Sequence, residues 1–103
     1  MQQKVKDFNS LMPCHTKPMP PSARLMDITS EIGELAKEVL KASKYGTKDF
    51  AATEDFKMEF GDVLYSLLSL AIETGIDAEE SLDKILAKYK ARIETKGSMG
   101  SEN

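Results

Sequence analysis

Two short acidic motifs of the same form recur in this sequence of 103 residues. The first is Glu31-Ile-Gly-Glu34 and the second is Glu59-Phe-Gly-Asp62. In a helix, carboxylates three positions apart lie on the same face. Four carboxylates from two such helices can supply the hard oxygen ligands that Mg²⁺ prefers, and they leave positions for water and a substrate phosphate. The repeat therefore indicates a divalent-cation site.

The two motifs also share a central glycine, Gly33 in the first and Gly61 in the second. A glycine inside a helix costs about 1 kcal/mol relative to alanine, so we expect another group to pack closely there. Helices that fold back antiparallel would bring the two motifs together. Their carboxylates, extended by Glu38 one turn further along, would then repel one another unless a cation lay between them.

A solvated acidic face is the simpler interpretation of the same pattern. The sequence contains 17 acidic residues, enough for such spacings to arise by chance. Ion pairs of Glu34 and Glu38 with Lys37 and Lys41 on one helix would explain much of the pattern without any function.

Basic residues follow a helical spacing near the end of the sequence. Lys84, Lys88 and Arg92 lie four positions apart and so share one helix face. Cations opposite a carboxylate-bound metal suit a polyphosphate, with lysine as a point charge and arginine as a fork. The alternative is that basic residues near a helix C-terminus favour the helix dipole and solubility.

Other candidate groups do not form a recognisable site. Cys14 and His15 are adjacent and too few for a tetrahedral metal centre. Ser66 and Ser69 have no base arrangement that would make either of them a nucleophile; they extend the polar stripe of the second motif toward Glu73. The lack of a glycine-rich phosphate loop excludes a P-loop NTPase.

Helical periodicity of apolar residues predicts the elements that position these groups, and no strand pattern of useful length occurs. The expected helices are a short one over residues 2–11, a long one from an N-cap at Ser22 to about Lys44, a second long one from an N-cap at Thr53 to Gly75, and a third from an N-cap at Asp77 to near Gly97.

The apolar faces of these helices predict how they pack. The second long helix is apolar over a wide arc, which indicates burial on more than one side and self-association into a larger bundle. The third helix is expected to turn Leu82, Ile85, Leu86 and Tyr89 inward.

Length and composition indicate one domain over residues 1–103, with a core at about 22–96, a proline-rich linker at 12–21 and a disordered tail at 97–103. The net charge of −3 argues against a polymeric nucleic-acid partner. The longest apolar stretch is too short to cross a bilayer, which argues against a membrane partner. A single cysteine and a polar N-terminus without a signal peptide favour a cytoplasmic location.

The sequence resembles the MazG-like nucleotide pyrophosphohydrolases of the all-α NTP pyrophosphatase superfamily over roughly residues 25–96. Three segments carry the resemblance: Glu31-Ile-Gly-Glu34-Leu-Ala-Lys-Glu38, Glu59-Phe-Gly-Asp62-Val-Leu-Tyr and Ile85-Leu-Ala-Lys88-Tyr-Lys-Ala-Arg92. The pairing of Glu-x-x-Glu with a later Glu-x-x-Asp is the signature of that family.

The resemblance implies an all-α, MazG-like helical bundle of three to four helices per chain, completed by assembly into a homodimer or homotetramer. It also implies Mg²⁺-dependent cleavage, with Mn²⁺ as a substitute, of a ribo- or deoxyribonucleoside triphosphate between the α and β phosphates. The products would be a monophosphate and pyrophosphate, and the role would be the house-cleaning of nucleotide pools.

Carried over by position, the resemblance assigns three roles. The metal ligands would be Glu31, Glu34, Glu59 and Asp62. The group that orients or deprotonates the attacking water would be Glu31 or Glu38, and the phosphate contacts would be Lys88 and Arg92.

Two departures from the family pattern limit this transfer. Many relatives have a glutamate where this sequence has Ser30, which leaves the number of metal ions open. Several carry a tryptophan near the base pocket, whereas this sequence has none, so base-recognising residues are not transferred. The alternatives are a non-catalytic helical bundle that acts through protein interaction, and a pyrophosphohydrolase acting on phosphoribosyl-ATP.

Overall fold

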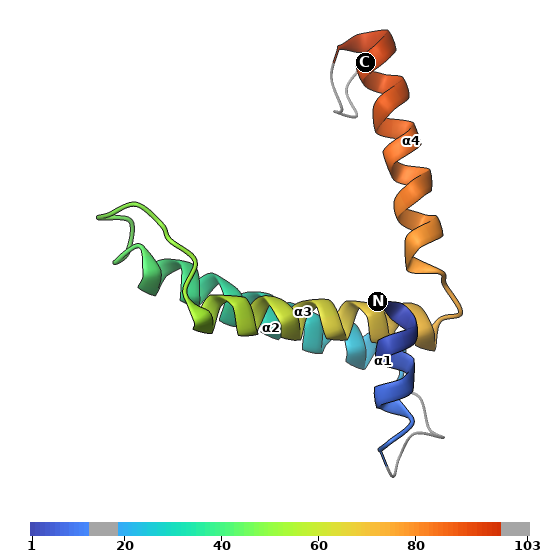
Figure 1. Ribbon diagram of the computed structural model, residues 1–103, viewed down its shortest axis with the longest axis horizontal. Helices are drawn as coiled ribbons and strands as arrows, with labels where there is room; N and C mark the ends of the chain where they lie inside the picture. Colours follow the sequence, from blue (N-terminus) through green and yellow to red (C-terminus); the bar gives the residue numbers. More distant parts are fainter. Residues whose placement is uncertain (13–18, 98–103) are drawn as a thin grey trace.

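The computed structural model of this protein describes residues 1–12 and 19–97, and it is helical in both ranges (Figure 1). Its elements are α1 (Gln2–Asn9), α2 (Pro21–Ala42), α3 (Glu54–Glu73) and α4 (Ala78–Lys96). No strand occurs in the described ranges, and the expected all-α class is confirmed. Residues 13–18 of the expected linker and 98–103 of the expected tail lie outside the described residues.

The capping residues expected from the sequence are present at three helix ends. The Thr53 hydroxyl accepts a hydrogen bond from the Phe56 backbone N–H at 3.0 Å, and the Asp77 carboxylate accepts one from the Glu80 N–H at 3.0 Å. Each satisfies an N–H that the first helical turn leaves without a backbone partner. Gly97 ends α4 with φ at 70°, a left-handed conformation that favours glycine.

The boundaries of two helices differ from those that the sequence predicted. Helix α2 begins at Pro21 rather than after an N-cap at Ser22, and Pro20 is its N-cap. The reason is that the fixed φ of proline suits the first helical position, where no N–H donor is needed. Helix α2 ends at Ala42, short of residue 44, and α1 ends at Asn9, short of residue 11.

Helices α2 and α3 pack side by side and form the centre of the molecule, and α1 packs across one end of α3 (Figure 1). The buried apolar side chains of the described residues are Val5 of α1, Ile28 of α2, and Leu68 and Ala71 of α3. This core is small for a chain of this length, and many large apolar side chains of the described residues remain exposed to solvent.

Polar side chains hold α1 against α3. Asn9 accepts a hydrogen bond from the Tyr65 hydroxyl at 2.5 Å and donates one to Ser69 Oγ at 3.3 Å. The ring of Phe8 packs edge-on against that of Tyr65, with centroids 6.0 Å apart. Because Ser69 is fully buried, this part of the expected polar stripe lies inside a helix–helix contact.

An ion pair joins α2 to α3 at the same end. Arg24 donates to both carboxylate oxygens of Glu73, at 3.1 Å and 2.7 Å, and both side chains are largely buried. The hydrogen bond to Glu73 is the main cause that raises the pKa of Arg24 above its ordinary value. A bidentate pair has a defined geometry, so it helps to fix the register of α2 against α3.

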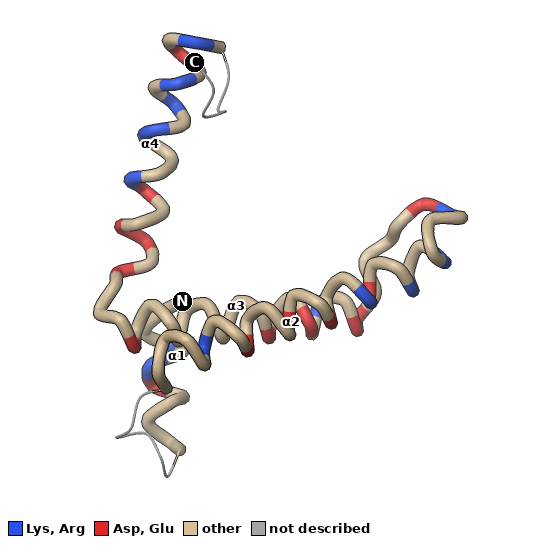
Figure 2. Tube along the Cα trace, turned by 180° about the vertical axis from the view of Figure 1, so that it is seen from behind, with Lys and Arg blue, Asp and Glu red and all other residues tan. Residues whose placement is uncertain are grey.

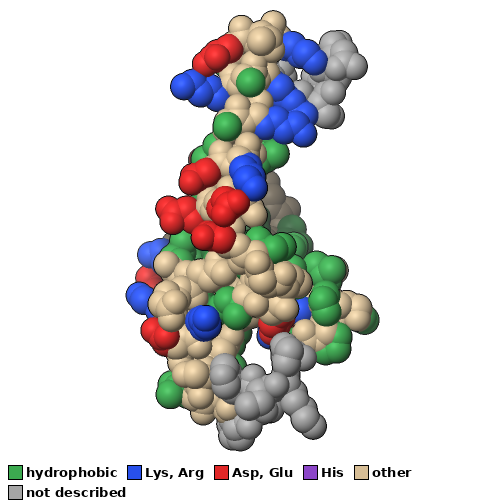
Figure 3. Space-filling view, turned by 90° about the vertical axis from the view of Figure 1, so that its right-hand side faces the viewer, with side chains coloured by type: hydrophobic (Ala, Val, Ile, Leu, Met, Phe, Trp, Pro, Cys, Tyr) green, Lys and Arg blue, Asp and Glu red, His purple; other side chains and the backbone are tan. Residues whose placement is uncertain are grey.

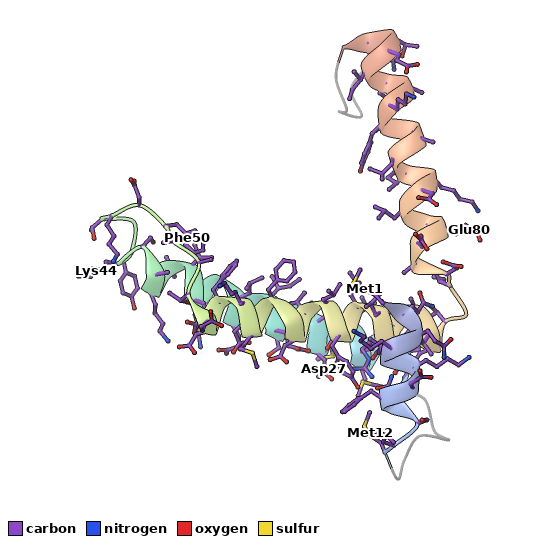
Figure 4. The ribbon with its side chains drawn as sticks, viewed as in Figure 1. Met1, Met12, Asp27, Lys44, Phe50 and Glu80 are labelled. Carbon is purple, nitrogen blue, oxygen red and sulfur yellow. The ribbon has the colours of Figure 1, made fainter. Side chains whose placement is uncertain are left out.

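Helix α4 projects away from the α2–α3 pair and makes at most marginal contact with the other helices (Figures 1 and 3). None of its residues is buried, and Leu82 and Leu86 are 53% and 51% exposed. Figure 4 shows side chains on both sides of α4 that face no other described helix. The expectation that Leu82, Ile85, Leu86 and Tyr89 turn inward is therefore wrong for a single chain.

The molecule is extended for its length. Its radius of gyration is 17.2 Å, whereas a compact domain of this size has about 13 Å. Its accessible surface is 7907 Å², compared with about 5,800 Å² for a compact monomer of this mass. The excess accessible surface includes apolar side chains of the central helix pair, such as Ile32, Phe60 and Leu67, which are each about half exposed.

Candidate metal and nucleotide site

The pairing of α2 with α3 brings the two acidic motifs together, as the sequence predicted. Figure 2 shows acidic residues along one edge of this helix pair. The pKa of Glu59 is raised above its ordinary value, first by partial burial and then by the negative charges of four neighbouring carboxylates: Asp62, Glu34, Glu38 and Glu31. We call these five residues the acidic cluster.

The acidic cluster has the ligand type that a hard divalent cation needs, but its carboxylates do not converge on one point. Carboxylate oxygens are preferred Mg²⁺ ligands, and a bound cation would relieve the repulsion that acts on Glu59. Among residues 1–12 and 19–97, no three His, Cys, Asp or Glu side chains are grouped closely enough to hold a metal ion. Binding would therefore require these side chains to turn toward one another.

Two carboxylates of the cluster have lysine partners on their own helix. Glu34 pairs with Lys37 at 3.3 Å, and Glu38 pairs with Lys41 at 3.1 Å. The hydrogen bond from Lys41 to Glu38 is the main cause of the raised pKa of Lys41. The Glu34–Lys37 pair is exposed on both sides, whereas the Glu38 side chain is only 13% exposed. An exposed pair stabilises a helix little. The Glu34–Lys37 pair is one that a solvated acidic face would form, so the structure contains this feature of the simpler interpretation as well.

Glu31 is held from the opposite helix. Its Oε1 accepts a hydrogen bond from the hydroxyl of Ser66 on α3 at 2.5 Å. Ser66 is only 3% exposed, so this bond lies within the α2–α3 contact. Sequence reasoning placed Ser66 on the polar stripe but found no partner for it, because the partner depends on the register of the two helices.

The two motif glycines do not pack against anything within the described part of one chain. A Cβ built at Gly33 or at Gly61 would have no atom of another element within 4 Å. The close packing that the sequence suggested is therefore absent here. Both positions leave open space beside the acidic cluster.

The basic residues of α4 lie away from the acidic cluster. In Figure 2 the basic residues gather on the distal half of α4, and the acidic edge belongs to the α2–α3 pair. Lys88 is exposed and Arg92 is partly exposed. Helix α4 has no substantial contact with α2 or α3, so a single chain does not bring Lys88 and Arg92 to the carboxylates.

Two further sequence expectations concern other parts of the chain. Cys14 and His15 lie outside the described residues. Within the described ranges, none of the helices has the length and apolar character needed to cross a lipid bilayer.

The raised pKa of Glu59 leads to a prediction for the metal-free protein. A carboxyl group whose pKa is higher in the folded state favours folding below its unfolded pKa of about 4.3 and loses that contribution as the pH rises through the folded-state value. Glu59→Gln is therefore expected to raise the melting temperature in EDTA at pH 7–8, with the difference from the unmodified protein shrinking toward pH 4.

Thermal unfolding followed by circular dichroism across this pH range measures the effect. Glu94→Gln, which removes a carboxylate on α4 outside the acidic cluster, is the control and should leave the pH dependence unchanged. If Glu59→Gln had the same melting temperature as the unmodified protein at every pH, the repulsion inferred for the cluster would be contradicted.

Comparison with known proteins identifies a family and a curated relative. The profile of the MazG nucleotide pyrophosphohydrolase domain matches residues 20–96. An uncharacterised protein of Bacillus subtilis (strain 168), YpjD, is 43% identical over an alignment of 75 residues, and the match covers 70% of this chain and 66% of the relative. The chain thus spans slightly less than two thirds of that curated relative. No solved structure was found to match it.

Proposed function

Because this chain belongs to the MazG nucleotide pyrophosphohydrolase family, we propose that it is a Mg²⁺-dependent nucleoside triphosphate pyrophosphohydrolase. In this proposal it cleaves a ribo- or deoxyribonucleoside triphosphate between the α and β phosphates and releases a monophosphate and pyrophosphate. The observation that carries the proposal is that α2 packs against α3, so that carboxylates of both motifs lie near Glu59 and raise its pKa.

In the proposed site, the side chains that would hold Mg²⁺, or Mn²⁺ in its place, are Glu31, Glu34, Glu59 and Asp62. When bound, such an ion neutralises phosphate charge and lowers the pKa of a bound water. The chain itself supplies the carboxylates that would hold the ion and a base. That base is Glu38 or Glu31, the latter being one of the same carboxylates, and it orients the attacking water and accepts its proton.

The proposed contacts to the phosphates are Lys88 and Arg92. Since α4 extends away from the acidic cluster in one chain, we propose that a second copy supplies them. The uncovered surface supports this: the excess over a compact monomer is about 2,000 Å² per chain, and two copies that buried it would match an obligate dimer interface. A homodimer is thus the smallest assembly that completes the site, and a homotetramer is the next.

The test is release of pyrophosphate from a panel of ribo- and deoxyribonucleoside triphosphates, measured with Mg²⁺, with Mn²⁺ and with EDTA. Monophosphate and pyrophosphate in equal amounts, formed only with the divalent cation, are the expected result. Because phosphoryl transfer depends mainly on positioning and charge neutralisation, EDTA should remove the activity entirely. The base and sugar preferences of the panel would then identify the substrate.

The same assay separates the two other interpretations. Turnover of phosphoribosyl-ATP without turnover of any nucleoside triphosphate would replace the proposed substrate class. A folded sample that binds Mg²⁺ but turns over none of these compounds would favour a non-catalytic bundle. The proposed role in cleaning cytoplasmic nucleotide pools depends on Mg²⁺-dependent turnover of a nucleoside triphosphate in this panel.

A further inference from the structure

We propose that Ser66 is a positioning residue that fixes the carboxylate of Glu31 toward the acidic cluster. This inference rests on the proposed function, because it assigns Ser66 a part in preparing the same site. Its basis is the hydrogen bond from Ser66 Oγ to Glu31 Oε1, 2.5 Å long, which crosses from α3 to α2.

The direction of the Ser66 hydroxyl sets it apart from the hydroxyls of three threonines on the helices and their caps. Thr29, Thr74 and Thr95 each donate to the backbone carbonyl four residues earlier in the chain. That local bond is the usual choice for a hydroxyl in a helix. Ser66 instead donates to a carboxylate on the neighbouring helix, so its hydroxyl contributes to the geometry of the cluster.

The surroundings of the Ser66–Glu31 bond also differ from those of the two lysine–glutamate pairs in the cluster. Glu34 and Glu38 pair with Lys37 and Lys41, whose side chains are 68% and 61% exposed and therefore held only loosely. Ser66 is 3% exposed, and a buried hydrogen bond is poorly replaced by water. Although the Glu38 side chain is itself only 13% exposed, its lysine partner lies in solvent, whereas the partner of Glu31 is fixed inside the protein.

A neutral hydroxyl is well suited to this task. It occupies one lone pair of Glu31 Oε1 and leaves Oε2 available to a cation or to a water molecule. Unlike a lysine, it adds no positive charge that would compete with a cation for the carboxylate. Groups that orient metal ligands in this way typically change metal affinity or activity about 10- to 100-fold when they are removed.

The experiment compares Ser66→Ala with Ser69→Ala in the full chain. Ser69 is the matched control because it is also buried on α3 and hydrogen-bonded, but to Asn9 rather than to a carboxylate. The probe is Mn²⁺, whose binding is followed by electron paramagnetic resonance without any nucleotide. We expect Ser66→Ala to weaken Mn²⁺ binding about tenfold and Ser69→Ala to leave it unchanged, although both should lower the melting temperature.

Kinetic measurements provide the second readout. With the best substrate of the panel, Ser66→Ala should lower kcat more than it alters KM, because a misdirected Glu31 affects the reacting geometry more than substrate binding. If Ser66→Ala fails to fold, Ser66→Cys serves instead: the thiol fills the space but is a weak donor, so a smaller loss in the same two quantities is expected.

The outcomes distinguish this inference from the function on which it rests. If the unmodified protein binds no Mn²⁺ and cleaves no substrate, the proposed function fails and Ser66 has no such role. If the unmodified protein is active but Ser66→Ala matches Ser69→Ala in Mn²⁺ affinity and in kcat, only the positioning role is overturned.

Discussion

Asp62→Asn and Glu34→Gln are each expected to lower kcat/KM for Mg²⁺-dependent pyrophosphate release by about a thousandfold or more. Each replacement keeps the size of the side chain but removes one of the charged oxygen ligands that the proposed site needs. Loss of several kcal/mol of transition-state stabilisation corresponds to an effect of this size. The measurement is steady-state kinetics with the best substrate of the nucleotide panel.

As a control, both variants must be shown to stay folded. Both residues are exposed, and removing a charge from a crowded cluster does not disturb packing, so the helical content should be unchanged. Mg²⁺ should raise the melting temperature of the unmodified protein, because a ligand of the folded state stabilises it, and should do so less in the variants. Full activity in both variants would contradict the assignment of the site.

Leu86→Glu is expected to break a homo-oligomer into monomers, with the loss of catalytic activity. Leu86 is 51% exposed in a single chain, so a monomeric protein would tolerate the change almost without effect. In an oligomer that covers α4, the change would lose about 2 kcal/mol of leucine burial per chain and place a charge in an apolar contact. Sedimentation velocity at several protein concentrations measures the result.

The matched control is Ala91→Glu. With about 100° between successive residues of a helix, Ala91 lies about 140° around α4 from Leu86, and it is exposed. Introducing the same charge there should leave the assembly intact. A protein that is monomeric and active before any substitution would contradict both the interface and the proposed supply of Lys88 and Arg92 by a second copy.

Local features of the sequence were sufficient to predict the helices. Thr53 and Asp77 cap α3 and α4 because their side chains accept hydrogen bonds from N–H groups only three residues away. The position of α4 could not be predicted in this way. Its apolar residues have the spacing of a buried helix face, yet periodicity states only that a face needs a partner, not which chain provides it.

The candidate site, like the fold, was predictable from the sequence only in part. Spacing placed Glu31, Glu34, Glu59 and Asp62 on two helix faces, and the packing of α2 against α3 brings these faces together. The link from Ser66 to Glu31 and that from Asn9 to Tyr65 had no sequence signal. Each joins residues far apart in the chain, and each depends on how one helix is rotated and shifted against another.

The sequence by itself determined the all-α class, the caps of α3 and α4, the acidic face of each central helix and membership of the family, because these depend on neighbouring residues or on repeated motifs. The tertiary structure alone decided which carboxylates share an environment, which of them Ser66 holds, and that α4 stands apart. The physical reason is that register is set by contacts across helices, such as that of Arg24 with Glu73, whose energies do not follow from the period of either helix.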